Sequence, residues 1–175
     1  MLSDDEMRTR MEKGWRAGKP FTVCGNGSLP GATSNVRRVL PIWCAKYGFR
    51  VVNDAGAGDM FWCAGMRWPV EYRPFDLIPR SLLVTRLDIT SETMPAADLI
   101  LCRMVLNHLD APRVTMALER FRASAPCLAA TQFDGPQPQR SPQFKRLDLR
   151  DWLGEPFDET PDGTEGDCRL ALWRL

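Results

Sequence analysis

The segment from Arg50 to Gly58 constrains the fold more than any other part of the chain. Arg50–Asp54 has the composition of a short buried strand, and it runs directly into the glycine-rich turn Ala55–Gly58. In open α/β sheets, ligands bind at the carboxyl ends of the strands, where glycines let the backbone come close. A Gly-x-Gly turn also occurs wherever a tight turn needs glycine, so this turn alone does not identify a ligand.

Further strands and helices are predicted to alternate along the chain. Thr33 or Ser34 is placed to cap a helix that ends at Tyr47, before Gly48, with a kink at Pro41. Further strands are predicted at Val70–Phe75, Leu82–Leu87, Asp98–Cys102, Cys127–Thr131, Phe144–Leu149 and Cys168–Trp173, and Asp110 is predicted to cap a helix after the fourth strand. This order predicts an α/β fold: a mainly parallel twisted sheet with helices on both faces and an antiparallel C-terminal edge strand.

The length of the chain, 175 residues, suits one domain with a real core. We predict that residues 1–33 form an N-terminal helix, at about Asp4–Trp15, followed by a lid-like loop rich in glycine. Residues 34–175 are predicted to form a single ligand-binding domain.

The charge balance predicts no general attraction to nucleic acid or to an anionic membrane. The chain has 23 Lys and Arg against 22 Asp and Glu, for a formal net charge of +1. The sequence shows no signal peptide and no apolar stretch long enough to span a bilayer, so a soluble protein is expected. Trp15, Met66 and Trp68 could supply apolar surface for a homodimer.

The cysteines and the single histidine argue against a metal site. The six cysteines form no CxxC pair, and His108 is the only histidine. Cys102 lies in an apolar run, where cysteine behaves as a small buried hydrophobe. We therefore expect reduced thiols, a cytoplasmic protein and no bound metal.

Two carboxylates follow the second and third predicted strands. Asp76 is placed to accept hydrogen bonds from both hydroxyls of a ribose, and Asp88 from an adenine amino group. Each of these residues taken singly is more often a turn or cap residue. Three strand ends in the right order make a nucleoside site the better interpretation.

These segments together resemble the class I (Rossmann-like) S-adenosylmethionine (SAM)-dependent methyltransferases, in particular a small bacterial and phage-type subgroup. The resemblance covers about residues 25 to 175, and the segment after the fourth strand is its most specific part. The matching segments are Gly25–Ser28, Val51–Trp62, Tyr72–Pro79, Leu87–Thr90, Asp98–Leu109 and Leu170–Leu175.

The resemblance implies methyl transfer from SAM to an unidentified acceptor, with S-adenosylhomocysteine (SAH) as product. It implies that Ile89 lies against adenine and that Cys102 and Arg103 line the methionine and methyl end. The full set of expected cofactor residues is Asp54, Ala55, Gly56, Gly58, Trp62, Asp76, Leu77, Asp88, Ile89, Cys102 and Arg103. The loop 102–108 would then face the acceptor and decide specificity.

The chain departs from the family at two places. Met104 stands where relatives usually carry an acidic residue, which puts in doubt any role of that carboxylate in orienting an acceptor. The connection from Asp76 to Leu82 is also shorter than the dozen or so residues that a parallel crossover normally needs. Either the third strand is displaced or the adenine pocket is shallower than in relatives.

His108 and Arg103 are the expected catalytic residues. His108 could act as a base near neutral pH, although a histidine here could also simply pack beside Asp110. Arg103 could orient an anionic acceptor or the SAM carboxylate, and a surface ion pair is the alternative. Trp62 could line the cofactor pocket, but an aromatic residue after a strand is more often part of the core.

Two other classes of function stay open. The chain could bind SAM without transferring a methyl group and act as a regulatory or interaction module. It could also be a dinucleotide-dependent oxidoreductase, although its glycine turn lacks the full Gly-x-Gly-x-x-Gly form. The usual signatures of amino-directed and cytosine C5 DNA methyltransferases are absent from the sequence.

Overall fold

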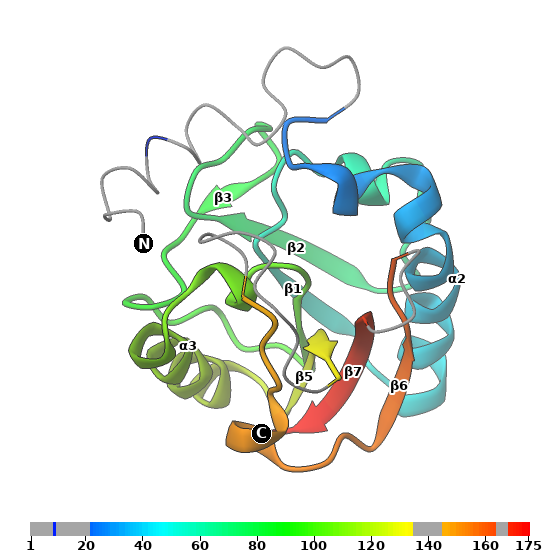
Figure 1. Cartoon of the computed structure of the whole chain (residues 1–175). Helices are drawn as coiled ribbons and strands as arrows, with labels where there is room; N and C mark the ends of the chain where they lie inside the picture. Colours follow the sequence, from blue (N-terminus) through cyan, green and yellow to red (C-terminus); the bar gives the residue numbers. More distant parts are fainter. Residues whose placement is uncertain (1–8, 10–21, 135–144, 164–167) are drawn as a thin grey trace.

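A computed structural model describes residue 9 and residues 22–134, 145–163 and 168–175 (Figure 1). The described strands are β1 Val51–Ala55, β2 Glu71–Asp76, β3 Thr85–Arg86, β4 Leu99–Cys102, β5 Cys127–Phe133, β6 Asp158–Pro161 and β7 Cys168–Arg174. The described helices are α2 Pro30–Tyr47, α3 Ala111–Ser124 and α4 Arg150–Leu153, with 3-10 turns η1 Asn26–Ser28, η2 Phe61–Cys63 and η3 Leu106–His108.

The described strands form one sheet in the order β3-β2-β1-β4-β5-β7-β6. Strands β1 to β5 pair in parallel, and β7 pairs antiparallel with both β5 and β6. The predicted mixed sheet with its antiparallel C-terminal end is therefore confirmed. The outermost strand at that end is β6, and β7 lies between it and β5.

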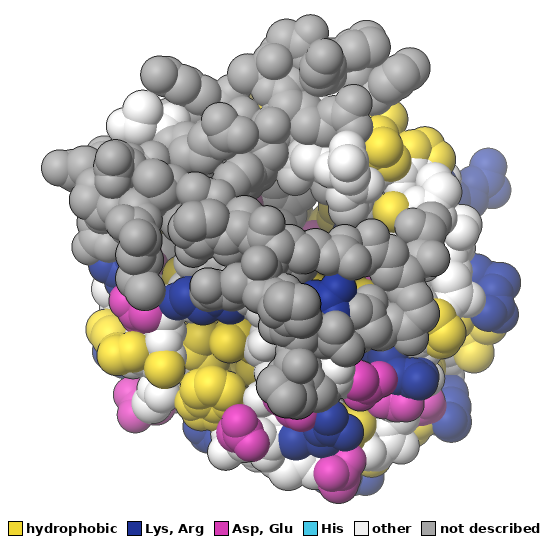
Figure 2. Space-filling view, in the orientation of Figure 1, with side chains coloured by type: hydrophobic (Ala, Val, Ile, Leu, Met, Phe, Trp, Pro, Cys, Tyr) yellow, Lys and Arg dark blue, Asp and Glu magenta, His cyan; other side chains and the backbone are white. Residues whose placement is uncertain are grey.

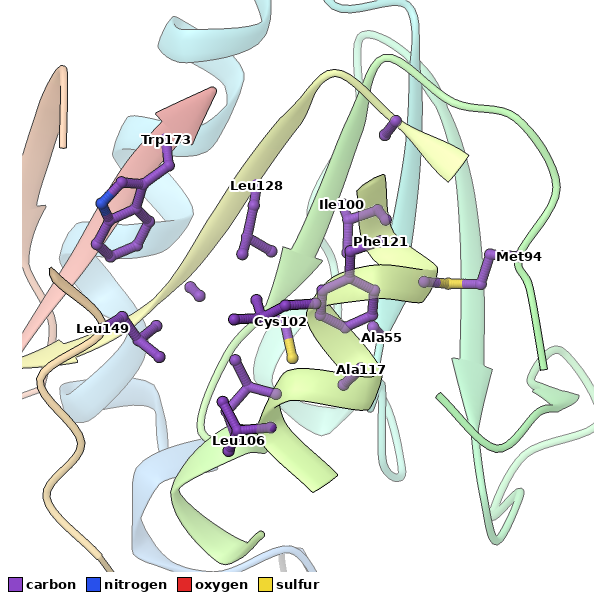
Figure 3. Close-up of a cluster of buried hydrophobic side chains, with 14 of the residues drawn as sticks. Ala55, Met94, Ile100, Cys102, Leu106, Ala117, Phe121, Leu128, Leu149 and Trp173 are labelled. Carbon is purple, nitrogen blue, oxygen red and sulfur yellow. The ribbon is translucent and has the colours of Figure 1, made fainter. Parts of the chain in front are cut away.

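Helices cover both faces of the sheet, as predicted. In β4, Ile100 and Cys102 pack with the apolar side of α3, whereas Leu99 and Leu101 pack with α2 on the opposite face. Figure 3 shows the core on the α3 side, where Phe121 is fully buried. Burying one such side chain stabilises the fold by about 1.5–3 kcal/mol.

The connections between the first strands contain no long helix. Within residues 22–134, the crossover from β4 to β5 contains the long helix α3, whereas β1 and β2 are joined by a segment whose only helical part is η2. The connection from β2 to β3 spans residues 77–84, because the third strand begins at Thr85 and not at Leu82. The third strand is thus displaced, and residues 82–84 serve as part of the crossover.

Helix α2 begins earlier than predicted. It begins at Pro30, with Leu29 at the N-cap, and not after Thr33 or Ser34. Proline suits the first helical turn because its missing N–H would have no partner there, and the Thr33 hydroxyl donates back to the Leu29 carbonyl (3.1 Å). The helix ends at Tyr47 as predicted, with Gly48 left-handed at φ 72°.

The C-terminal region differs from its prediction. The described part of the strand expected at 144–149 has no strand conformation, and α4 begins at Arg150. The sheet is instead completed by β6, which has only one buried residue, Thr160. Its polar composition suits an exposed edge strand, and it carries no apolar signal.

Some expectations lie outside the described residues. These are the N-terminal helix at about Asp4–Trp15, of which only residue 9 is described, and most of the loop after Asp134. Among the described helices, none has the length and hydropathy that a membrane crossing requires.

Candidate functional site

The glycine turn lies at the carboxyl end of β1 and is bound to the end of β2. Gly56 and Gly58 have positive φ values of 101° and 62°, a conformation that glycine adopts without strain. The backbone N–H groups of Gly56 and Ala57 both donate to the Phe75 carbonyl, at 2.8 and 2.9 Å. These two hydrogen bonds hold the turn beside the end of β2, where Asp76 follows Phe75.

Asp76 occupies the centre of this edge. Its carboxylate accepts the Gly58 N–H (2.8 Å) and the Ile78 N–H (2.9 Å), and burial raises its pKa. Each carboxylate oxygen has two lone pairs, so both retain capacity for another donor. The carboxylate thus connects the glycine turn to the β2–β3 connection and can still accept from a diol.

Asp88 lies two residues beyond β3. Its Oδ1 accepts both the N–H (2.9 Å) and the hydroxyl (2.7 Å) of Thr90. Partial burial acts to raise the pKa of Asp88, but these hydrogen bonds outweigh it, and the pKa lies below its usual value. The next residue, Ile89, is half-buried against the core. The Asp88 carboxylate, a charged hydrogen-bond acceptor, therefore lies next to an apolar side chain.

Two side chains of the protein itself approach the glycines closely. A Cβ at Gly56 would lie 2.2 Å from a methyl of Val105, and a Cβ at Gly58 would lie 2.5 Å from the Cys24 sulfur. These approaches account for both glycines without a ligand. Whether Gly56 and Gly58 also contact a cofactor stays a prediction.

Asp59 holds the segment before η1 over the turn. Its Oδ2 accepts the Thr22 hydroxyl (2.7 Å) and the Val23 N–H (2.9 Å), and its own N–H donates to the Cys24 sulfur (3.2 Å). Burial raises the pKa of Cys24 to about 11, so the thiol is neutral. Sequence reasoning missed Asp59 and Cys24, because their pairing depends on contacts between distant segments.

Asp54 and Trp62 lie beneath the turn, on the α2 side of the sheet. Asp54 is 1% exposed and accepts a hydrogen bond from the Tyr72 hydroxyl. Burial raises the pKa of Asp54 to about 7. Trp62 is buried and packs edge-on against Trp68. The structure places Asp54 and Trp62 in the core, where they support the turn from below.

Three other expected cofactor residues have different surroundings. Ala55 and Cys102 are buried on the α3 side of the sheet, and Figure 3 shows both side chains within the apolar cluster. Only their backbone is therefore placed to meet a ligand. Leu77, in contrast, is 37% exposed just after Asp76.

Arg103 forms a buried ion pair. Its Nε and one terminal nitrogen donate to Oδ1 of Asp162, at 2.9 and 2.7 Å, and the two side chains are 5% and 0% exposed. Asp162 follows β6, so the pair joins the carboxyl end of β4 to the turn before β7. The guanidinium is committed to this carboxylate, which sequence reasoning did not identify.

The loop after β4 closes this end of the sheet. Met104 has a left-handed φ of 56°, and its N–H donates to the Thr131 hydroxyl of β5 (2.7 Å). Its side chain lies 3.7 Å from the position of a Cβ at Gly27. A positive φ at a non-glycine residue stores strain that the surrounding contacts must offset. Residues 104–105 thus adjoin both the glycine turn and η1.

His108 and Asn107 lie in η3, directly after residues 104–105. His108 is half-buried, and its backbone N–H donates to the Val105 carbonyl (2.9 Å). Asp110 caps α3 by accepting the Arg113 N–H (3.0 Å), as predicted. The described part of the chain contains no group of three or more potential metal ligands.

A polar groove of about 490 Å³ lies elsewhere, at the antiparallel end of the sheet. It is lined by Asp134, Arg150, Glu155, Pro156, Phe157, Asp158, Glu159 and Arg169. Its arginines are ion-paired, Arg169 with Asp134 and Glu159 and Arg150 with Asp148. Figure 2 shows basic and acidic side chains interspersed along this lower part of the molecule. We therefore place the candidate site at the glycine turn.

Comparisons with known proteins identify the fold. No known family's sequence model matches the chain, and no curated protein matches it. Solved structures do. Magnesium protoporphyrin IX methyltransferase from Synechocystis PCC 6803, with bound SAM, is 16% identical, with a TM-score of 0.60 over 81% of this chain and 78% of its own.

Two further solved structures show the same fold. Burkholderia thailandensis 1,6-didemethyltoxoflavin-N1-methyltransferase, with bound SAH, is 20% identical, with a TM-score of 0.60 over 85% of this chain and 78% of its own. Human N-acetylserotonin methyltransferase, in complex with SAM, is 15% identical, with a TM-score of 0.56 over 79% of this chain and 51% of its own. The chain thus has the class I methyltransferase fold expected from the resemblance, and it spans about half the length of the human enzyme.

Proposed function

We propose that this chain is a SAM-dependent methyltransferase acting on an acceptor that its loop 104–108 selects. One observation carries the proposal: the glycine turn, Asp76 and Asp88 lie at the carboxyl ends of three adjacent parallel strands in a methyltransferase fold. A nucleoside ligand of such a sheet binds at that edge.

The residues at this edge suit the parts of SAM. Asp76 retains lone pairs for the ribose hydroxyls, and Asp88 offers a charged acceptor to the adenine amino group with Ile89 beside it. Gly56, Gly58 and Leu77 would complete the contact surface. Asp54, Ala55, Trp62 and Cys102 would support it from within the core. Bound SAM supplies an electrophilic methyl group on a positive sulfur.

The protein's part in such a reaction is to position the acceptor and exclude water. Val105 lies against Gly56 of the glycine turn, and Met104 lies beside Gly27 of η1, so both add apolar surface next to the site. His108 would accept a proton where the acceptor nucleophile must lose one. Arg103, committed to Asp162, would hold the loop after β4 in place and would not bind an acceptor directly.

A binding module without transfer activity is the second candidate. The close approach of Val105 and Cys24 to the glycines and the short connection from β2 to β3 favour it. Calorimetry with SAM, followed by transfer of a labelled methyl group to a bacterial extract, separates the two. Methyltransferase activity predicts both binding and label transfer, and binding without label in any fraction would favour the module. Affinity for NAD and none for SAM would overturn both and point to an oxidoreductase.

The role of His108 has its own test. A role as general base predicts that His108→Ala lowers kcat by about 10²–10⁴-fold. Unchanged turnover across pH would assign the residue a packing role.

The setting of the protein is part of the proposal. We infer a bacterial or phage protein of the cytoplasm, with SAH as the product and a homodimer as the oligomer to test. The evenly balanced charge gives no support for nucleic acid as the acceptor. Gel filtration with light scattering would test the dimer.

A further inference from the structure

Residues 22–28, which we call the strap, reach from the turn after β1 to the loop after β4. The strap (blue in Figure 1) leads into α2. Near its start, the Cys24 sulfur lies 2.5 Å from the position of a Cβ at Gly58. Further along, the Cβ position of Gly27 lies 3.7 Å from the Met104 side chain. The strap therefore contacts segments at the carboxyl ends of both β1 and β4.

The sheet order reverses between these two strands. Strands β2 and β3 extend from β1 in one direction, and β5 extends from β4 in the other. Ligands of open α/β sheets bind at such a reversal, outside the carboxyl ends of the strands. A strap that joins these two ends lies across the place where such a ligand enters.

The Asp59 carboxylate attaches the strap to the glycine turn. Its Oδ2 accepts the Thr22 hydroxyl and the Val23 N–H, at 2.7 and 2.9 Å, and the Thr22 hydroxyl accepts the Cys24 N–H (3.0 Å). Burial acts to raise the pKa of Asp59, but its hydrogen bonds outweigh burial, and the pKa lies below its usual value. Asp59 is therefore ionised at neutral pH, and hydrogen bonds to an ionised acceptor are the stronger kind.

The contact at the other end of the strap is weaker. Gly27 and Met104 meet in an ordinary van der Waals contact, which a flexible methionine side chain gives up at little cost. Within the strap, the Ser28 N–H donates to the Gly25 carbonyl (3.2 Å), so this part can move as one piece. The described hydrogen bonds that must break for the strap to lift are those to Asp59.

We propose that the strap opens and closes over the candidate site with Asp59 as its latch, so that SAM and SAH enter and leave only when Thr22 and Val23 are released. Asp59 then acts as a positioning residue, because it works through the strap and not on the ligand. This inference rests on the proposed function.

The Cys24 thiol reports the opening of the strap without any ligand. Five of the six cysteines are buried, whereas Cys24 is partly exposed. Burial raises the pKa of Cys24 from 9.0 to about 11, and only the thiolate attacks a disulfide reagent such as DTNB. Asp59→Asn, which removes the ionised acceptor, should raise the rate of DTNB labelling about tenfold or more. Adding Cys24→Ser should abolish this fast labelling.

Asp98→Asn is the matched control. Asp98 also accepts two backbone N–H groups, those of Arg50 and Val51, but at the amino end of the sheet. Asp98→Asn should label at the rate of the unsubstituted protein, and equal rates in Asp59→Asn and Asp98→Asn would overturn the proposal. If circular dichroism shows that Asp59→Asn is unfolded, Thr22→Val takes its place, because it deletes one latch bond and keeps the shape of the side chain.

Stopped-flow binding of SAH tests whether the strap controls ligand entry. Asp59→Asn should raise the association and dissociation rate constants together, because opening limits both directions, and Kd should change much less than either. Unchanged rate constants, or a rise in dissociation alone, would overturn this inference and leave the proposed function intact. Failure of the unsubstituted protein to bind SAM or SAH would overturn the proposed function as well.

Discussion

Gly56 lies where two requirements for glycine coincide. Its φ of 101° disfavours any side chain, and Val105 leaves no room for a Cβ. The sequence pattern identified the turn, but it could not show that a neighbouring side chain fills the approach. That contact joins the turn of β1 to the loop after β4 and depends on the folded arrangement.

Gly56→Ala should lower the free energy of unfolding by several kcal/mol. We expect about 1–3 kcal/mol from backbone strain and about 1–3 kcal/mol from overpacking against Val105. Adding Val105→Ala should recover the overpacking part and leave the strain. Urea denaturation of the single and double variants measures both.

Gly31 provides the control for this prediction. It lies in α2 without a positive φ, and nothing stands within 4 Å of its Cβ position. Gly31→Ala should therefore leave stability unchanged or raise it by up to about 1 kcal/mol. The account of the turn would be wrong if Gly56→Ala behaved in the same way.

Asp54 should make stability fall as pH rises. Burial raises its folded-state pKa to about 7, above the ordinary value of 3.8, so between these values the folded state binds more protons than the unfolded state. The contribution is fully present below about pH 4 and is lost as pH rises through about 7, with a slope of at most about 1.4 kcal/mol per pH unit. Asp54→Asn should flatten the pH profile of the free energy of unfolding, and an identical slope in both proteins would refute the assignment.

Among the elements, the central strands were predicted more completely than the edge strands, because β3 occupies only two residues of the strand predicted at 82–87 and β6 was not predicted. Strands β1, β4 and β5 are buried on both faces; β4 is an apolar run, and β1 and β5 begin with apolar residues. Strands β3 and β6 are short and mostly exposed, so their sequences carry little pattern. Their positions follow from pairing with a neighbouring strand.

The ion pair of Arg103 and Asp162 connects the end of β4 to the turn after β6. Removing one partner of a buried pair leaves an uncompensated charge, so Asp162→Ala should cost about 3–5 kcal/mol. Arg103→Met with Asp162→Leu should cost clearly less than Asp162→Ala alone, because no charge then stays buried. Urea denaturation of the unsubstituted protein, Asp162→Ala and the double variant measures these losses in the free energy of unfolding.

An exposed pair serves as the comparison. Lys46 bonds Asp158 at 2.8 Å, but its side chain is 56% exposed. Because solvent screens an exposed pair, Lys46→Ala should lower the free energy of unfolding much less than Asp162→Ala does. Similar losses for Lys46→Ala and Asp162→Ala would contradict the special role of the buried pair.

In the whole molecule, the arrangement of the strands determines which residues can share a site. The sequence predicted Asp76 and Asp88, because a strand end can be recognised locally. It did not predict Asp162 or Asp59, because their surroundings come from segments far apart in the chain. Residues at strand ends were thus easier to predict than contacts between distant segments.

Calorimetric titration of SAM into Asp76→Asn and Asp98→Asn tests the central claim most directly. Both carboxylates accept two backbone N–H groups, Asp76 at the carboxyl end of the sheet and Asp98, through Arg50 and Val51, at the amino end. The unsubstituted protein should bind one SAM per chain, Asp76→Asn should bind it roughly 10–100-fold more weakly, and Asp98→Asn should bind it unchanged. Absence of SAM binding by the unsubstituted protein, or equal affinity in all three proteins, would contradict a cofactor held at the ends of β1 to β3.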